Sequence, residues 1–240
     1  MNDKRISTGI EGLDEKMRGG FLENSVNLIT GKTGTGKTAL CASFIKKGAE
    51  EGQNGVYVTT EESEEGIIKD MESMFSWNFK KLQDKEKLKM ITLKPIFPSE
   101  SIEELNKLAR NYISNFLREL KESVKELEAE RVVIDSVSLI EMFVQNEYIA
   151  RVALSSLIDT LKDLEATTIV VGTLPESSRG LTDEGIAEYL VDSIIKMEFL
   201  PVVEEYDRTL TIRKMRRTDH STDIHPFKIT PDGLKVVEIR

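Results

Sequence analysis

The sequence has almost no cysteine, and that absence excludes a fold stabilised by disulfides. Cys41 is the only cysteine in 240 residues, so no disulfide can form within the chain. Long apolar runs are missing as well, since the opening residues MNDKRISTGI lack the apolar core of a secretory signal. No apolar segment reaches the roughly 18 residues that a membrane-spanning helix needs. Together these absences predict a protein of the reducing cytoplasm.

An excess of positive charge is also lacking, which bears on the class of partner. The chain carries 33 Lys and Arg against 42 Asp and Glu, a formal net charge of -9. Proteins that bind nucleic acid usually present a basic stripe, so this balance argues against a nucleic-acid partner. Hydrophobic residues make up 39%, which is typical of a globular chain. Because the sequence has no repeat and no low-complexity linker, we predict one domain over residues 1–240.

Short apolar segments alternate with amphipathic ones along most of the chain. Runs rich in apolar and β-branched residues predict strands at 25–30, 55–60, 88–93, 131–135 and 167–173. The intervening patterns predict helices at about 37–51, 64–74, 100–130 and 150–165. Four closely spaced strands are predicted at the end, at 193–199, 209–215, 226–229 and 234–239. This order predicts an α/β fold with a mostly parallel central sheet flanked by helices, followed by C-terminal antiparallel strands.

The longest predicted helix, 100–130, has an apolar residue at every third or fourth position from Leu105 to Leu127. Ser101 and Glu104 fit a capping box at its start. Such a face usually packs on a sheet, and a groove for a cofactor or partner is the alternative. We expect the helix to pack against the sheet.

The segment from Gly31 to Thr38, GKTGTGKT, matches the phosphate-binding pattern G-x-x-x-x-G-K-[ST] in full. Its glycines allow backbone turns that aim N–H groups at phosphate oxygens, at the positive end of the following helix. Lys37 would place its charge on the β- and γ-phosphates, and the hydroxyl of Thr38 would bind Mg²⁺. A chance glycine-rich turn is the alternative, but the apolar strand before the segment and the helix after it favour the motif. The predicted nucleotide-binding residues are Gly31, Thr33, Gly34, Thr35, Gly36, Lys37, Thr38 and Ala39.

Acidic residues follow two of the predicted strands. Asp135 ends the strand 131–135, where a carboxylate can hold Mg²⁺ through water; capping the next turn is the alternative. Glu61 and Glu62 follow the strand 55–60, and one of them could orient or deprotonate the attacking water. Because they belong to the charge run EESEE, a solvated acidic turn is the alternative.

The base of the nucleotide is predicted to be adenine. Guanine-specific P-loop proteins read their base with an NKxD motif. The only Asn-Lys pair, Asn106-Lys107, continues as Leu-Ala within the long helix. We therefore predict ATP as the nucleotide.

With these motifs in this order, the chain resembles the KaiC-like branch of the RecA/RadA ATPases, in its archaeal single-domain form, over essentially its whole length. TGIEGLDEKMRGGFLENSVNLITGKTGTGKT resembles the family's opening, VYVTTEE its strand with two catalytic glutamates, VVIDS its Walker B strand and HPFKITPDGLKV its closing strands. The segment 208–221 resembles the signature K-x-R-x-[ST]-x-H. The resemblance implies a RecA-like P-loop NTPase fold.

The resemblance also implies how a complete site forms. It assigns catalysis to Lys37, Glu61 and Glu62, with ATP and Mg²⁺ as cofactors. The signature residues would reach the nucleotide of a neighbouring subunit in a homo-oligomeric ring, usually a hexamer; they are Lys214, Arg216, Thr218 and His220. Without the family, KMRR would be interpreted as a solvated basic strand. His225 is interpreted as a loop residue before Pro226.

The chain departs from the family's clock proteins and from recombinases. The clock proteins carry two such domains, and their phosphorylated Ser-Thr pair falls at Glu188-Tyr189 here, which leaves autokinase activity open and argues against timekeeping. The loops that bind DNA in recombinases correspond to 141–146 and 174–185, which together hold one basic residue, Arg179. Strand exchange is therefore not expected.

Three functions follow from these observations. The first is a ring ATPase that hydrolyses ATP between subunits. The second is a nucleotide-gated binding or assembly module with a protein partner, as in the archaeal flagellar accessory ATPase, where hydrolysis is incidental. The third is a DNA-repair ATPase resembling RadA paralogues, which the acidic balance opposes. The intact pair Glu61-Glu62 favours the first, because a binding module need not keep both.

Overall fold

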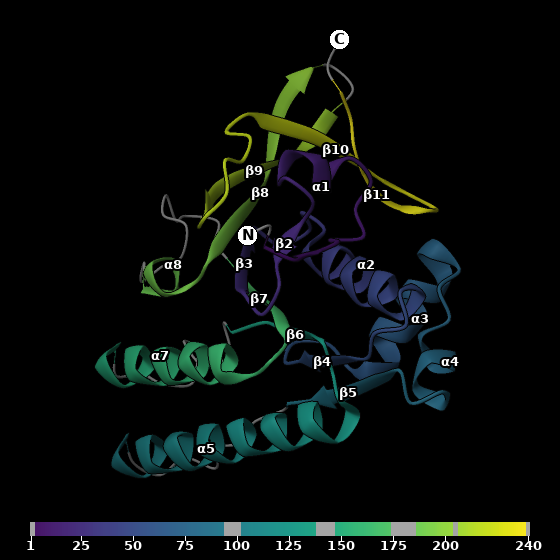
Figure 1. The fold of residues 1–240 in the computed structure, drawn as a ribbon. Coiled ribbons are helices and arrows are strands. Elements are labelled where there is room, and N and C mark those ends of the chain that lie inside the picture. Colours follow the sequence, from purple (N-terminus) through teal and green to yellow (C-terminus); the bar gives the residue numbers. More distant parts are fainter. Residues whose placement is uncertain (1–2, 94–101, 138–146, 174–185, 204–205, 239–240) are drawn as a thin grey trace.

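The computed structural model describes residues 3–93, 102–137, 147–173, 186–203 and 206–238, and its main feature is one large sheet (Figure 1). Its strands are β3 (Val26–Gly31), β4 (Gly55–Thr59), β5 (Leu88–Thr92), β6 (Arg131–Asp135), β7 (Thr167–Thr173), β8 (Ser193–Val203), β9 (Tyr206–Met215), β10 (Ile224–Thr230) and β11 (Gly233–Val236). They are hydrogen-bonded in the order β11-β10-β9-β8-β3-β7-β6-β4-β5.

The type of strand pairing changes once across this sheet, at β8. From β8 through β3, β7, β6 and β4 to β5, neighbouring strands run parallel. From β8 to β9, β10 and β11 they run antiparallel. This arrangement confirms the predicted fold class, a mostly parallel sheet with antiparallel strands at the C-terminal end.

Helices cover both faces of the sheet (Figure 1). The larger ones are α2 (Lys37–Glu50), α3 (Glu64–Phe75), α5 (Ile102–Leu127) and α7 (Glu147–Asp163). Short elements complete the described chain: β1 (Arg5–Ile6), α1 (Leu13–Lys16), β2 (Phe21–Leu22), α4 (Phe79–Asp84) and α8 (Ile186–Leu190). Among the helices in the described ranges, none combines the length and the apolar character that crossing a membrane requires.

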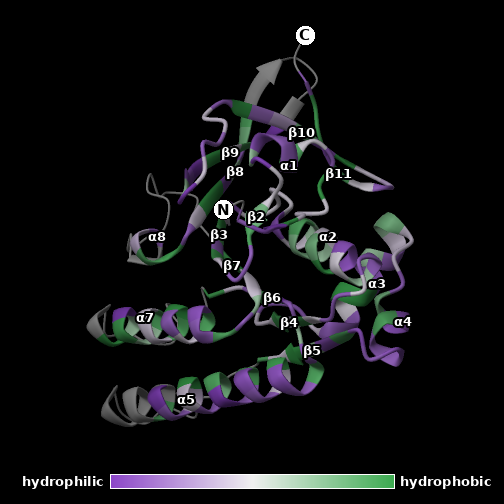
Figure 2. Cartoon of the chain, in the orientation of Figure 1, coloured by the Kyte–Doolittle hydropathy of each residue, from purple (hydrophilic) through white to green (hydrophobic). Residues whose placement is uncertain are grey.

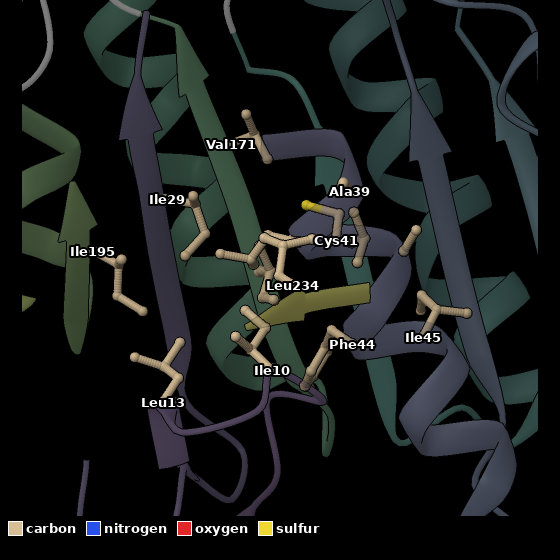
Figure 3. Close-up of a cluster of buried hydrophobic side chains, with 14 of the residues drawn as sticks. Ile10, Leu13, Ile29, Ala39, Cys41, Phe44, Ile45, Val171, Ile195 and Leu234 are labelled. Carbon is tan, nitrogen blue, oxygen red and sulfur yellow. The ribbon is translucent and has the colours of Figure 1, made fainter. Parts of the chain in front are cut away.

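Adjacent residues of β3 show how the two faces are buried. Ile29 belongs to a cluster with α1, α2 and β11, whereas Leu28 belongs to a cluster with α5 and α7. Figure 3 shows the first cluster, in which Phe44 and Ile45 of α2 face the sheet. Because side chains alternate along a strand, a sheet buried on both faces has continuous apolar strands. Burial of both faces explains why unbroken apolar runs in the sequence predict these strands.

The predicted helix 100–130 is confirmed as a helix packed on the sheet. Phe116, Leu120 and Val124 of α5 are buried in the cluster with α7, and polar residues alternate with them along the helix (Figure 2). The helix ends at Leu127 rather than at residue 130, because Glu128 adopts a left-handed φ of 50°. Its predicted start at residue 100, with the capping residue Ser101, lies outside the described residues.

One interpretation of the sequence was wrong. His225 lies in β10 opposite Leu210 of β9, not in a loop, and only 8% of it is exposed. Its Nε2 lies 2.9 Å from the hydroxyl of Ser221. The strand was predicted to begin at Pro226, because proline cannot donate to a ladder and usually marks the edge of a strand, whereas β10 begins at Ile224. The short elements were also missed, since periodicity needs more residues than they contain.

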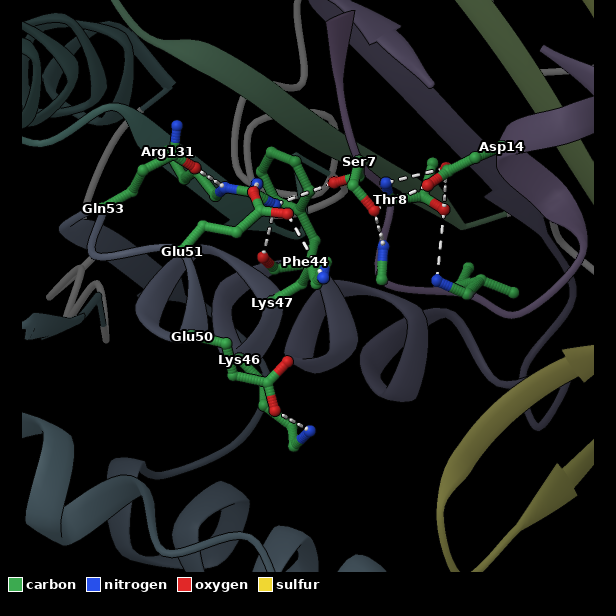
Figure 4. Close-up of polar contacts among 12 residues, drawn as sticks. Ser7, Thr8, Asp14, Phe44, Lys46, Lys47, Glu50, Glu51, Gln53 and Arg131 are labelled. Carbon is green, nitrogen blue, oxygen red and sulfur yellow. Dashed lines mark hydrogen bonds and ion pairs between the residues drawn. The ribbon is translucent and has the colours of Figure 1, made fainter. Parts of the chain in front are cut away.

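A buried arginine ties three segments together (Figure 4). Arg131, at the start of β6, is fully buried, and its guanidinium donates to Ser7 O and Phe44 O at 2.8 Å each. It also donates to Gln53 Oε1 at 2.6 Å and to Glu51 Oε2 at 2.8 Å. These bonds hold the N-terminal segment and the C-terminal end of α2 against β6, beneath the site described next.

Candidate nucleotide-binding site

The loop from Gly31 to Thr38 joins the end of β3 to the start of α2. Gly34 and Gly36 have φ values of 81° and 105°, which residues with a Cβ rarely adopt. Within the described chain, no side chain caps the first turn of α2. Its first N–H groups therefore point at the loop without a capping acceptor, as a helix terminus that binds phosphate requires.

The other predicted loop residues have distinct surroundings. Thr33 is exposed on the loop, whereas Thr35 is buried and donates from its hydroxyl to Lys32 O at 2.9 Å. Ala39 lies in the first turn of α2 and packs into the core with its methyl group. The backbone of all three remains part of the loop or the helix start, where N–H groups rather than side chains would contact phosphate.

Lys37 lies across the loop that precedes it. Its ammonium donates to Gly31 O and Lys32 O at 2.8 Å each, and only 8% of the residue is exposed. Burial lowers the pKa of Lys37, and the nearby carboxylates of Asp135 and Glu61 partly offset this effect. The side chain thus brings a largely desolvated positive charge to the loop.

Asp135 ends β6 beside the loop. Its Oδ2 accepts one hydrogen bond from Thr38 Oγ1 at 2.9 Å and another from the Tyr57 hydroxyl at 2.8 Å. Burial raises the pKa of Asp135, whereas the hydrogen bonds from Tyr57 and Thr38 lower it. The parallel register of β4 and β6 sets Thr59 opposite Asp135, so the strand that precedes the glutamate pair ends at the same edge.

The two glutamates of the predicted pair differ in their contacts. Ser136 Oγ donates to Glu61 Oε1 at 2.6 Å, so Glu61 is held beside the residue that follows Asp135. The backbone of Ser136 is fixed in turn, because its N–H donates to Thr60 Oγ1 at 2.9 Å. Glu62 has a pKa raised by burial and by the surrounding carboxylates, and its backbone carbonyl accepts from the Thr59 hydroxyl.

The donor atoms at this site fit magnesium bound together with a nucleotide. The Thr38 hydroxyl and the Asp135 carboxylate are oxygen donors 2.9 Å apart, and Mg²⁺ prefers oxygen ligands. In the ranges that the structure describes, no group of three or more His, Cys, Asp or Glu side chains could hold a metal by itself. The protein would thus supply part of a ligand set, and phosphate oxygens and water would complete it.

The predicted signature residues lie elsewhere in the chain. Lys214 Nζ donates to Glu188 O and Val191 O at 2.8 Å each, and Arg216 donates to Tyr189 O at 3.1 Å. Both cations thus contact carbonyls in and just after α8, where the partial negative charge of a helix terminus gathers. Desolvation lowers the pKa of Lys214, with a further contribution from Arg216.

The remaining two signature residues continue past the end of β9. The Thr218 hydroxyl accepts a hydrogen bond from the Arg5 guanidinium at 2.9 Å. His220 Nδ1 lies 2.9 Å from Ser221 O. The bond from Arg5 fixes the segment against the N-terminal strand β1.

The strand register separates the signature residues from the phosphate loop. Met215, at the end of β9, pairs with Ser193, which pairs with Asn27 near the start of β3. Gly31, where the loop begins, pairs with Met197 at the opposite end of the shared register. Asn27 and Gly31 are four residues apart along β3, which corresponds to about 13 Å. Within one chain, therefore, Lys214 and the residues after it lie at the end of the sheet opposite the phosphate loop.

Two residues of this site were not predicted from the sequence, Tyr57 and Ser136. A tyrosine within a largely apolar strand was a usable signal, because a buried hydroxyl normally needs a partner. Ser136 gave no signal, because a serine after a strand is common in turns.

A mostly parallel sheet with a phosphate loop leading into a helix, and an aspartate at the end of a parallel strand of the same sheet, is the arrangement of a P-loop NTPase. The family model described as "ATPase: KaiC" matches residues 6–240. The chain therefore belongs to the KaiC family of ATPases, which assigns it to proteins that bind and hydrolyse ATP.

Individual proteins agree with this assignment. A UPF0273 protein of Methanopyrus kandleri is 35% identical over 235 residues, covering 97% of this chain and 92% of that protein. A KaiC-like protein of Pyrococcus horikoshii, solved as a crystal structure, superposes with a TM-score of 0.84 at 35% identity, covering 98% of this chain and 100% of that one. The circadian clock protein KaiC2 of Synechocystis is 31% identical, but the match covers 98% of this chain and only 40% of that protein.

Proposed function

We propose that this protein hydrolyses ATP with Mg²⁺ at the interfaces of a homo-oligomeric ring, with six subunits as the expected number. Lys214 and Arg216 are separated from the phosphate loop by about four residues of strand, which supports a site shared between two subunits. Side chains at one end of the sheet cannot complete a site at the other end of the same chain. A head-to-tail interface between subunits can bring the two ends together, and such interfaces close into rings.

One subunit would supply the binding half of the site. The residues from Gly31 to Ala39 would surround the phosphates with backbone N–H groups, and Lys37 would add its charge. Thr38 and Asp135 would hold Mg²⁺, with Asp135 acting through water. When bound, the metal would neutralise charge on the transferred phosphoryl group.

The same subunit would activate the attacking water. Of the two glutamates, we assign this role to Glu61, because its carboxylate is held by Ser136 and its charge acts on Lys37. Glu62 would support the site, since burial and then the neighbouring carboxylates raise its pKa. A carboxylate that accepts a proton from water contributes typically ~10²–10⁴-fold in rate.

The neighbouring subunit would supply the other half. Lys214 and Arg216 would reach the γ-phosphate, with Thr218 and His220 supporting the contact. Such a finger contributes about 10³–10⁵-fold in rate in other P-loop enzymes. In the single chain both cations bind carbonyls of the α8 region, so those hydrogen bonds would be exchanged for the phosphate in the ring.

Mixed rings test the proposal directly. We expect Arg216→Ala alone and the double variant Glu61→Gln/Glu62→Gln alone to be inactive. In an equal mixture, about a quarter of the heterologous interfaces would pair an intact finger with intact acids. ATPase activity should then return to about that fraction of the wild-type rate. Mixed rings that assemble, as shown by light scattering, but remain inactive would overturn the shared site.

A second candidate function is a nucleotide-gated binding module. An apolar groove of about 490 Å³ between α5 and α7, lined by Ile113, Leu117, Ile149 and Val152 among others, offers a face for a protein partner. A partner captured from cell extract by the double glutamine variant with ATP, but not without nucleotide, would support this function. A cytoplasmic location and the absence of a nucleic-acid partner remain predictions.

A further inference from the structure

Tyr57 lies in the middle of β4, within the core and without exposed surface. Its ring belongs to the same buried cluster as Cys41 of α2. Its hydroxyl, however, donates to Asp135 Oδ2 at 2.8 Å. One side chain thus connects the hydrophobic core to the aspartate at the candidate site.

Packing of the core does not explain why residue 57 is a tyrosine with a hydroxyl. Phenylalanine would fill nearly the same volume, and a buried hydroxyl costs free energy unless a partner satisfies it. A tyrosine hydroxyl keeps its proton at neutral pH, because the ordinary pKa of a phenol is about 10. The hydroxyl is therefore a permanent donor aimed at one carboxylate oxygen.

The second donor to Asp135 has a different task. The Thr38 hydroxyl bonds to the same oxygen at 2.9 Å, but its own oxygen is the expected Mg²⁺ ligand. Thr38 would move with the metal and the phosphates, because it sits on the loop that binds them. Tyr57 is anchored in the core instead, so its bond can hold the carboxylate still while ligands enter and leave.

We propose that Tyr57 is a positioning residue for magnesium binding: it orients Asp135 so that the carboxylate can hold, through water, the Mg²⁺ of a bound nucleotide. The inference rests on the proposed function, since it requires a Mg²⁺-nucleotide at this site. Removing the hydroxyl leaves the nucleotide's contacts with the phosphate loop in place. Without the hydroxyl the buried carboxylate of Asp135 can rotate, so the affinity that decreases is the affinity for the metal.

The experiment compares nucleotide binding with and without the metal. Isothermal titration calorimetry of ADP is carried out in EDTA and in excess Mg²⁺, for wild type and Tyr57→Phe. In EDTA, we expect wild type and Tyr57→Phe to bind ADP with equal affinity, within about twofold. We expect the increase in ADP affinity that Mg²⁺ causes to be about tenfold smaller in Tyr57→Phe than in wild type. Electron paramagnetic resonance of Mn²⁺ titrated into the ADP complex measures the metal affinity directly and should show the same loss.

Steady-state kinetics separates positioning from a loss of catalysis. Tyr57→Phe should need about ten times more Mg²⁺ for half-maximal ATPase activity, while kcat at saturating Mg²⁺ stays near the wild-type value. Tyr112→Phe is the matched control, because Tyr112 is a partly buried tyrosine of α5 packed in the other cluster. This control should keep wild-type values in every measurement.

A double-mutant cycle with Asp135→Asn tests whether Tyr57 acts through Asp135. If it does, Tyr57→Phe adds no further loss of Mn²⁺ affinity in the Asp135→Asn background. Additive losses would overturn the inference, and so would wild-type Mn²⁺ affinity in a Tyr57→Phe protein that binds ADP in EDTA. A Tyr57→Phe protein that does not bind ADP in EDTA would indicate a structural role instead. If wild type gained no affinity from Mg²⁺, the proposed function would fail first.

Discussion

Ser136 donates a hydrogen bond to Glu61 across 2.6 Å, from the strand that ends in Asp135 to the turn after the neighbouring strand. A reciprocal bond runs from Tyr57 on that neighbouring strand to Asp135. Each of the two carboxylates is thus held by a hydroxyl from the other strand. Because β4 and β6 pair in parallel register, both bonds form at the same edge of the sheet.

The two glutamates should differ when they are changed singly. We expect Glu61→Gln to lower kcat by about 10²–10⁴-fold with ATP affinity retained, because the amide cannot accept the water's proton. Glu62→Gln should lower kcat by less, since Glu62 lacks the contact with Ser136 that Glu61 makes. Single-turnover hydrolysis together with equilibrium ATP binding distinguishes the two. Equal losses for both variants would argue against the assignment to Glu61.

Ser136→Ala should act through Glu61. Removing the hydroxyl leaves the carboxylate without its donor, and we expect kcat to fall about tenfold while KM for ATP changes little. Ser136→Thr keeps a hydroxyl and should restore part of the rate. A loss of ATP affinity instead of rate would show that Ser136 supports binding, not catalysis.

Lys37 should be needed for nucleotide binding itself. Lys37→Ala removes the buried charge at the phosphate loop, and we expect the affinity for ATP to fall at least about 100-fold. Fluorescence titration with a labelled nucleotide measures this change. Lys46→Ala, on the same helix but paired with Glu50 at the surface, should bind like wild type. Unchanged binding by Lys37→Ala would contradict the assignment of the loop.

Arg131 should matter for stability rather than for chemistry. Arg131→Met leaves the carbonyls of Ser7 and Phe44 without their buried donor, so we expect a loss of about 3–5 kcal/mol in unfolding free energy. Chemical denaturation monitored by circular dichroism gives the value. Lys89→Met breaks the exposed pair with Glu126 and should cost at most about 1 kcal/mol. Similar losses in both variants would mean that the buried contacts are not held in solution.

His225 should make the protein sensitive to mild acid. Burial, helped by Lys16, lowers the pKa of His225 below 6.5, so the unfolded state binds the proton more readily than the folded state. The stability that neutral His225 contributes is present above the unfolded pKa and is lost as pH falls through the folded pKa. Between about pH 7.5 and 5, the melting temperature of His225→Gln should therefore fall less than that of wild type. His220→Gln should follow wild type, and parallel curves for all three proteins would contradict this prediction.

The phosphate loop could be predicted from the sequence because its function depends on local backbone geometry. Glycines at fixed spacing and a lysine at the start of the helix act within eight consecutive residues, so no distant contact is needed to recognise them. The strands and large helices were predicted for a similar reason, since apolar runs and helical periodicity are local patterns. Asp135 and the glutamate pair could be placed at strand ends, but their partners could not be named.

Contacts between distant segments were decided only by the tertiary structure. The bond between Tyr57 and Asp135 joins residues 78 positions apart, and the burial of Arg131 depends on the N-terminal segment and the end of α2. An arginine at the start of a strand would ordinarily be taken as exposed, because only tertiary packing can satisfy its charge when buried.

The sequence alone therefore determined that this chain carries a phosphate loop, a mostly parallel sheet and the ordered motifs of its family. The tertiary structure decided which hydroxyl holds which carboxylate. It also decided that Lys214 lies at the opposite end of the sheet from Gly31. The physical reason is strand register, which depends on pairing between segments far apart in the chain and which no local pattern encodes.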